Sequence, residues 1–345
     1  VHLFFNISGT VIFMVVFYTL NTFVHFSFLN TAASPAGIAV IHSLFNIGAT
    51  ILLFPFANLL EKMAILAIPD KGSEVEEMEE EKINPDLARL DERFLDKPGF
   101  AMEECRGVAI NMARKSKKAM NLAIDLLKEY DEKTSARVEK LENQIDQYED
   151  ALGTYLVKLS ERDLSVKDSR ILSVLLHCIG DFERISDHAV NIRDAAVEMN
   201  KKNLQFSDKA KQELLVFSNA IRDIIDRAVL AFETGDTGLA KEVEPLEQVV
   251  DALNKEEKQR HINRLRTGTC TIELGFVLSD ISTNFERAAD HCSNIAVCLL
   301  QVDEGGFDTH EYLDILKEEN SEEFRHEYME LSEKYTLPES KHGGK

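Results

Sequence analysis

Between Gly99 and Gln301, apolar residues recur at intervals of three and four, the spacing of one face of an α-helix. Gly and Pro are sparse inside these periodic segments. The pattern predicts six helices, at residues 99–130, 134–161, 166–201, 208–233, 237–267 and 270–301. The third has an apolar seam that consists of Leu172, Leu175, Ile179, Phe182, Ala189 and Ala196. This part of the chain is therefore expected to be an all-α bundle.

Local signals mark several of the predicted helix ends. Ser165 followed by Asp168 resembles a capping box at the start of the third helix. Ser207 or Asp208 can cap the fourth helix, and Gly235 and Gly268 interrupt the second half of the bundle.

The first 60 residues have a different pattern, since they contain no Asp, Glu, Lys or Arg. Residues 3–29 and 36–60 are each long enough to cross a bilayer, which takes about 20 apolar residues. They predict a transmembrane hairpin; buried core helices are the alternative. An acidic linker (61–98) would connect the hairpin to a helical domain (99–305), followed by a C-terminal helix and tail (306–345). Because Val1 lies inside an apolar run, we expect the chain to be a fragment of a longer membrane protein.

Each predicted span carries the pattern His-x-x-Phe-Asn-x-x-x-Thr, which places three polar side chains on one face of an apolar helix. The six residues are His2, Asn6, Thr10, His42, Asn46 and Thr50. Polar groups at membrane depth face protein or a water-filled cavity. They would either join neighbouring helices by hydrogen bonds or line a solute path.

A second repeat carries the strongest functional signal. FERISDHAVNI, from Phe182, and NFERAADHCSNI, from Asn284, share seven residue types when Phe182 is aligned with Phe285. Helical spacing aligns Glu183 with Asp187, and Glu286 with Asp290. Stacked carboxylates repel each other, so an arrangement built twice predicts that a cation binds there.

Two further ExxxD elements belong to the same duplication. Glu142 and Asp146 on the second predicted helix correspond to Glu247 and Asp251 on the fifth. Adjacent antiparallel helices would bring the elements of each half face to face. The chain therefore contains two three-helix repeats, at about 99–201 and 208–301, with four ExxxD elements.

The donor chemistry limits the ions that such a site would prefer. Carboxylate oxygens suit hard or borderline cations such as Mg²⁺, Mn²⁺ or iron better than a structural zinc site. The alternative is a solvated acidic face whose charge is balanced by Arg184 and Arg287. His188 and His291 would be either direct ligands or packing groups beside the site.

Composition excludes some classes of function. The net charge of −21 argues against nucleic acid as a partner. The five cysteines contain no CxxC pair and are expected to be reduced thiols. A di-iron oxidase would need Glu-x-x-His pairs that the ExxxD elements do not supply. We therefore expect no enzymatic activity.

The paired ERxxDH elements and three-helix repeats resemble PhoU, the phosphate-uptake regulatory family, over about residues 99–301. The resemblance implies multinuclear metal clusters, chiefly of iron or zinc. The ligands it implies are Glu142, Asp146, Glu183, Asp187, Glu247, Asp251, Glu286 and Asp290. The chain departs from the family pattern at Ser186 and Ala289, where Gly often precedes the Asp.

The HxxFN segments resemble the bacterial, type II-related Na⁺/phosphate cotransporter family, whose members often carry a C-terminal PhoU-like domain. That family's QSSS signatures do not occur in this chain and would lie upstream of Val1.

Together, the two resemblances imply the C-terminal part of a sodium-dependent phosphate transporter with a cytoplasmic metal-binding regulatory domain. The alternative is a membrane-tethered signalling or adaptor protein of phosphate homeostasis, without transport activity. The implied location is multi-pass in the inner (plasma) membrane, in contact with lipid. Phosphate and the coupling ion Na⁺ would bind through the upstream part; a homo-oligomer or a phosphate-signalling protein would be the further partner.

Overall fold

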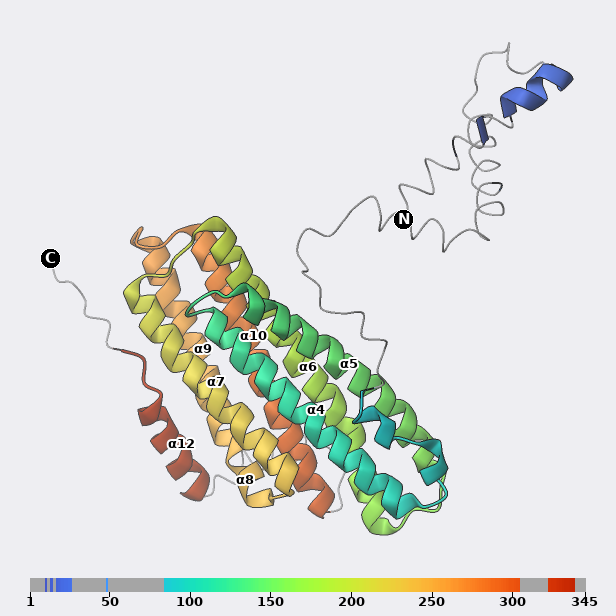
Figure 1. Ribbon diagram of the computed structural model, residues 1–345. Coiled ribbons are helices and arrows are strands. Elements are labelled where there is room, and N and C mark those ends of the chain that lie inside the picture. The colour runs from blue at the N-terminus through green and yellow to red at the C-terminus, as the bar shows by residue number, and fades with distance from the viewer. Residues whose placement is uncertain are drawn as a thin grey trace. The chain divides into compact units, whose positions relative to one another are not determined.

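Figure 1 shows the computed structural model of the chain, which describes residues 84–304 and 322–338. In the first 60 residues it also describes 10, 13–14, 17–26 and 48. The chain divides into two compact units, residues 1–80 and 81–345. Of the six polar residues that the sequence places on the membrane helices, Thr10 is the one the structure describes, and the others lie outside the described residues.

The structure gives no support to the predicted transmembrane hairpin. Most of residues 3–29 and 36–60 lie outside the described residues. Within the described part of the chain, every helix is too short or too polar to cross a bilayer. The predicted multi-pass location in the inner membrane is contradicted by this finding.

The second unit is an all-α bundle, as the sequence predicts, and residues 84–304 and 322–338 contain no strand. Two short 3₁₀ helices, η3 (Leu87–Arg89) and η4 (Glu92–Phe94), come first. The α-helices that follow are α4 (Pro98–Leu126), α5 (Glu132–Ser160), α6 (Val166–Lys202), α7 (Asp208–Thr234), α8 (Thr237–Lys241), α9 (Val243–Arg266), α10 (Ile272–Glu304) and α12 (Glu322–Lys334).

One predicted helix is divided in the structure. The segment 237–267 forms the short α8 and the longer α9, separated at Glu242. Pro245 lies in the first turn of α9, where its missing N–H is not needed for an intrahelical bond. A proline is readily accommodated near a helix start but disrupts a helix interior, so the chain begins a new helix here.

The predicted capping residues act as expected. The Asp168 amide donates to Ser165 Oγ (3.1 Å), and Ser165 Oγ donates to the Asp168 carboxylate (2.7 Å). The Ala210 amide donates to Ser207 Oγ at the start of α7. Helix α7 ends at Gly235, whose φ of 67° is in the left-handed region that glycine adopts without steric cost.

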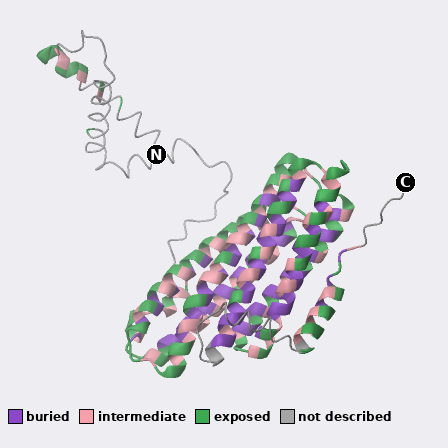
Figure 2. Cartoon of the chain, turned by 180° about the vertical axis from the view of Figure 1, so that it is seen from behind, coloured by how far each residue is buried: buried purple, intermediate pink, exposed green. Residues whose placement is uncertain are grey.

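The helices pack as two groups of three, α4–α5–α6 and α7–α9–α10, which meet along α6 and α10 and along α4 and α7 (Figure 1). Buried residues lie between the helices and exposed residues on the outer faces (Figure 2). The seam predicted for α6 is buried throughout. At its centre the Phe182 ring packs edge-on against Phe232 of the second group, with centroids 4.9 Å apart. The two groups therefore share one core.

Segments before and after the bundle cover its outer faces. Residues 84–97, inside the predicted linker, pack on α4 and α5: Tyr155 Oη donates to the Asp91 carbonyl at 2.9 Å, and Arg89 pairs with Glu104. Helix α12 packs on α9 and buries Leu331, Tyr335 and Leu337.

Candidate metal centre

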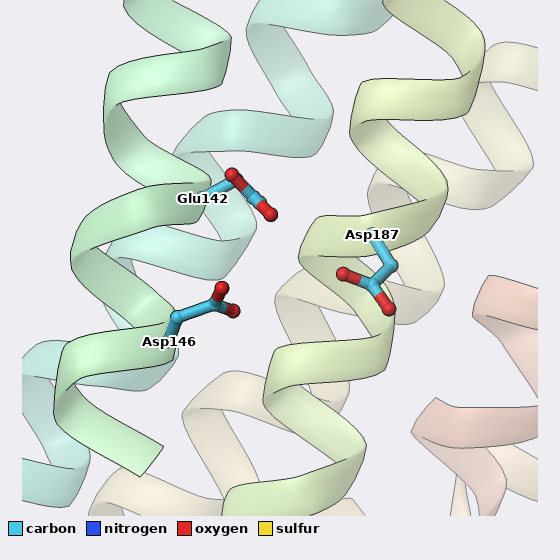
Figure 3. Close-up of side chains that lie close together, drawn as sticks. All are labelled: Glu142, Asp146 and Asp187. Atoms are coloured by element: carbon cyan, nitrogen blue, oxygen red, sulfur yellow. The ribbon is translucent and has the colours of Figure 1, made fainter. Parts of the chain in front are cut away.

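Three carboxylates converge between α5 and α6 in the first repeat. Glu142 and Asp146 lie one turn apart on α5, and Asp187 faces them from α6 (Figure 3). One oxygen from each carboxylate lies within 4.8 Å of the others. Asp146 is exposed and the other two are partly buried, so the cluster is open to solvent on one side. The antiparallel neighbours α5 and α6 thus bring two of the predicted ExxxD elements together.

The electrostatics of this cluster disfavour its negative charge. Partial burial, followed by the charge of Asp187, raises the pKa of Asp146 above its ordinary value. Burial, Asp146 and Asp187 together raise the pKa of Glu142. Glu183, one turn before Asp187, has a pKa raised to about 7, again through burial first and Asp187 second. A bound cation would relieve the repulsion that contributes to all three shifts.

Part of the charge is balanced within the protein. Arg184 lies 3.4 Å from Glu183 and 3.2 Å from Asp187, and its side chain is 61% exposed. The local balance that the sequence offered as an alternative to metal is therefore present in the structure. Because an exposed arginine is solvated and held weakly, its pairing is compatible with exchange for a cation.

The second repeat has the same plan with looser geometry. Glu247 and Asp251 on α9 and Glu286 and Asp290 on α10 are all partly buried. Burial, followed by Glu286, raises the pKa of Asp290, and Asp251 contributes as well. Arg287 pairs with Asp290 at 3.4 Å, as Arg184 does with Asp187. Within the described part of the chain, only the first repeat brings three ligand atoms within 4.8 Å of each other.

The two histidines lie between the repeats rather than inside the carboxylate clusters. Their rings stack with centroids 5.5 Å apart. His188 Nδ1 lies 2.9 Å from Asn284 Oδ1, and His291 Nδ1 lies 2.8 Å from Asp181 Oδ1. Both rings therefore lie at the contact of α6 and α10.

The sequence does not predict the partners of these histidines. Asp181 and Asn284 each directly precede the phenylalanine of the repeated motif, and they are 103 residues apart. Asn284 already begins the second copy of the motif, but its position in the sequence does not show that it contacts His188. The pair also differs chemically, because one repeat contributes a carboxylate and the other an amide.

The donor set fits a cation. Three carboxylates from two rigid helices provide oxygen ligands at short mutual distance, the arrangement that hard and borderline cations prefer. The histidine nitrogens bonded to Asn284 and Asp181 are occupied by those bonds. Glu142, Asp146 and Asp187 are therefore the residues that would hold an ion in the first repeat.

Comparison with known proteins agrees with the duplication. The model of the PhoU domain family matches residues 109–196 and 214–299, one stretch in each group of three helices. The two stretches contain all eight predicted metal ligands.

Named relatives and solved structures show the same likeness. The chain is 23% identical over 188 residues to the "Phosphate-specific transport system accessory protein PhoU homolog 1" of Thermotoga maritima, covering 54% of this chain and 80% of that protein. It is also 23% identical over 219 residues to the "Phosphate-specific transport system accessory protein PhoU homolog" of Pseudomonas aeruginosa. That match covers 63% of this chain and 90% of that protein.

The crystal structure of PhoU from Pseudomonas aeruginosa superposes with a TM-score of 0.56 at 22% identity, covering 59% of this chain and 97% of that one. The phosphate transport system regulatory protein PhoU of Streptococcus pneumoniae superposes with a TM-score of 0.55 at 17% identity, covering 61% and 99%. These likenesses support the PhoU resemblance and the all-α fold. They give no support to the resemblance with the Na⁺/phosphate cotransporter family.

Proposed function

The chain belongs to the PhoU domain family, and from this premise we propose that it is a regulatory accessory protein of phosphate transport whose ExxxD stripes bind metal ions. The relatives named above are accessory and regulatory proteins of phosphate transport systems, not enzymes. The chain would accordingly associate with a phosphate transport system rather than catalyse a reaction.

The convergence of Glu142, Asp146 and Asp187 carries the metal part of the proposal. These side chains come from two helices, and burial followed by the neighbouring carboxylates raises the pKa of Glu142 and of Asp146. A folded protein keeps like charges this close at a cost, which a cation bound to the folded state would offset. Glu183 would be a fourth ligand after small rearrangement, since Arg184 now pairs with it.

The second cluster, formed by Glu247, Asp251, Glu286 and Asp290, would hold its ion after Arg287 moves away. Iron, zinc, Mg²⁺ and Mn²⁺ all accept carboxylate oxygens. The two clusters lie on different repeats of one bundle, so metal would stabilise both repeats.

The two functions that the sequence suggested are unequally supported. The C-terminal part of a sodium-dependent transporter, with Na⁺ and phosphate as its ligands, rests on segments that lie mostly outside the described residues. A regulator without transport activity of its own rests on the family match and on the names of the relatives. We therefore favour the regulator.

Metal content tests the site. The full chain, purified without chelator, would be analysed by inductively coupled plasma mass spectrometry beside the variant Asp146→Asn/Asp187→Asn. Glu161→Gln, which removes a charge from an exposed residue at the end of α5, is the control. We expect the double variant to lose metal and the control to retain it. Equal metal content in all three proteins would refute the cluster.

Phosphate accumulation tests the function separately. In the source organism, deletion of the gene should change phosphate uptake under phosphate-replete conditions, and the intact gene should restore it. Co-purification of the tagged chain with components of a phosphate transport system would identify the partner. Unchanged uptake together with no such component would overturn the regulatory role, whatever the metal content.

A further inference from the structure

Two cysteines lie on the helices that join the repeats. Cys178 is on α6 and Cys298 is on α10. Cys178 is fully buried, whereas Cys298 keeps 8% of its surface exposed. Both thiols therefore lie in the shared core of the two repeats, and Cys298 is the less deeply buried of them.

The register of α6 against α10 places these cysteines opposite each other. Asp181 Oδ1 accepts hydrogen bonds from the Asn294 amide (3.3 Å) and lies 2.8 Å from His291 Nδ1. The helices run antiparallel, because Asn284, earlier on α10, bonds Asn191, later on α6. Cys178 lies about one turn before Asp181 on α6. Cys298 lies about one turn after Asn294 on α10, so the two cysteines are at facing positions.

The two facing thiols influence each other's ionisation. A hydrogen bond from the Cys178 thiol raises the pKa of Cys178, with burial adding to the shift. The same bond lowers the pKa of Cys298, in opposition to burial. Cys298, the less deeply buried of the two, is therefore the better nucleophile, and Cys178 faces it as the resolving thiol.

We propose that Cys178 and Cys298 form a reversible disulfide that covalently joins the two repeats. Glutathione disulfide would serve as the oxidant. The Cys298 thiolate attacks one of its sulfurs, and the S–S bond breaks to release one glutathione thiolate. Cys178, on losing its proton, then attacks Cys298 in the mixed disulfide and releases a second glutathione. One protein disulfide forms, two glutathiones are produced, and electrons and protons balance.

The proposed bond would act on the contact between α6 and α10, each of which carries part of one carboxylate cluster. It lies about one turn beyond the Asp181–Asn294 contact, in the same pair of helices. Oxidation would fix α6 against α10 and oppose any sliding of one repeat past the other. The inference is independent of metal binding and of the regulatory role, since it concerns two thiols outside both clusters.

The test equilibrates the native full chain in glutathione buffers of stepwise increasing oxidation, followed by acid quenching, alkylation and peptide mapping. We expect a peptide pair joined through Cys178 and Cys298, whose abundance follows the buffer ratio and disappears after dithiothreitol. In Cys178→Ser, glutathione should remain on Cys298. In Cys298→Ser, Cys178 should stay unmodified because it is fully buried.

The other cysteines supply the controls. Cys105 and Cys292 are as deeply buried as Cys178, and Cys270 is partly exposed. Modification of Cys270 alone, or cross-links that pair cysteines at random, would overturn the proposal. So would failure of the wild-type chain, which needs no substitution to fold, to form the pair in the most oxidising buffer. The oxidised protein should also melt higher, by roughly 10 °C, because a long loop is closed; a lower melting temperature would contradict a bond that fits the native packing.

Discussion

The raised pKa of Glu183 makes the stability of the metal-free protein depend on pH. The ordinary pKa of this carboxyl is 4.5, and in the folded protein it is about 7. Between these values the folded state binds the proton more tightly than the unfolded state does. The free energy of unfolding therefore falls as pH rises from about 4.5 through about 7.

The size of this effect follows from the shift. Each pKa unit corresponds to about 1.4 kcal/mol, so the full shift would give about 3 kcal/mol. The Glu183 side chain is 22% exposed and lies beside solvated Arg184, so solvent screening reduces the expected contribution to about 1 kcal/mol. Glu183→Gln cannot lose this proton and should remove that part of the pH dependence.

The measurement is urea unfolding of chelator-treated protein at several pH values between 5 and 8. We expect the wild-type curve to fall more steeply than that of Glu183→Gln, whereas Glu161→Gln should follow the wild type. If the proposed site binds metal, addition of Mn²⁺ at pH 8 should restore stability to the wild type. Parallel curves for the wild type and Glu183→Gln would refute this account of the cluster's electrostatics.

Three further predictions concern the bundle. Phe182→Ala removes a fully buried ring that contacts Phe232 and should lower the free energy of unfolding in urea by about 3–5 kcal/mol; a loss below 1 kcal/mol would contradict a shared core. Ser165→Ala removes the cap of α6 and should cost about 1 kcal/mol in the same assay, while Ser165→Asp should retain most of the stability. Leu331→Ala should cost about 2–4 kcal/mol and increase hydrogen exchange in α12 first; unchanged exchange there would show that α12 does not depend on this buried contact.

The sequence predicted the helices well because their signals are local. The three-and-four spacing of apolar residues, Ser165 and Ser207 at helix starts, and Gly235 at a helix end all act within one or two turns. The break between α8 and α9 was missed because Pro245 was not weighed as a helix start. The membrane hairpin was predicted from uncharged runs alone, and hydropathy does not establish that a helix crosses a bilayer.

The candidate site was predictable in its residues but not in its geometry. Four ExxxD elements follow from the repeat, yet nothing in their spacing shows that Glu142, Asp146 and Asp187 approach more closely than their counterparts in the second repeat. The local sequence also gave the histidines no partners. Their partners, Asp181 and Asn284, lie about 100 residues away in the chain, and these contacts depend on how the repeats pack. Such tertiary contacts cannot be predicted from local sequence.

Residues 84–97 and helix α12, which cover outer faces of the bundle, determine which fragment of the chain can be isolated. A fragment trimmed to the family-matched stretches, 109–299, would lose both. It would expose the Tyr148 and Tyr155 face of α5, now capped by residues 84–97, and the α9 surface beneath Leu331 and Tyr335. Such a fragment should aggregate through apolar patches that the longer chain keeps covered. Residues 84–338 are therefore the smallest unit that keeps these faces of the bundle intact.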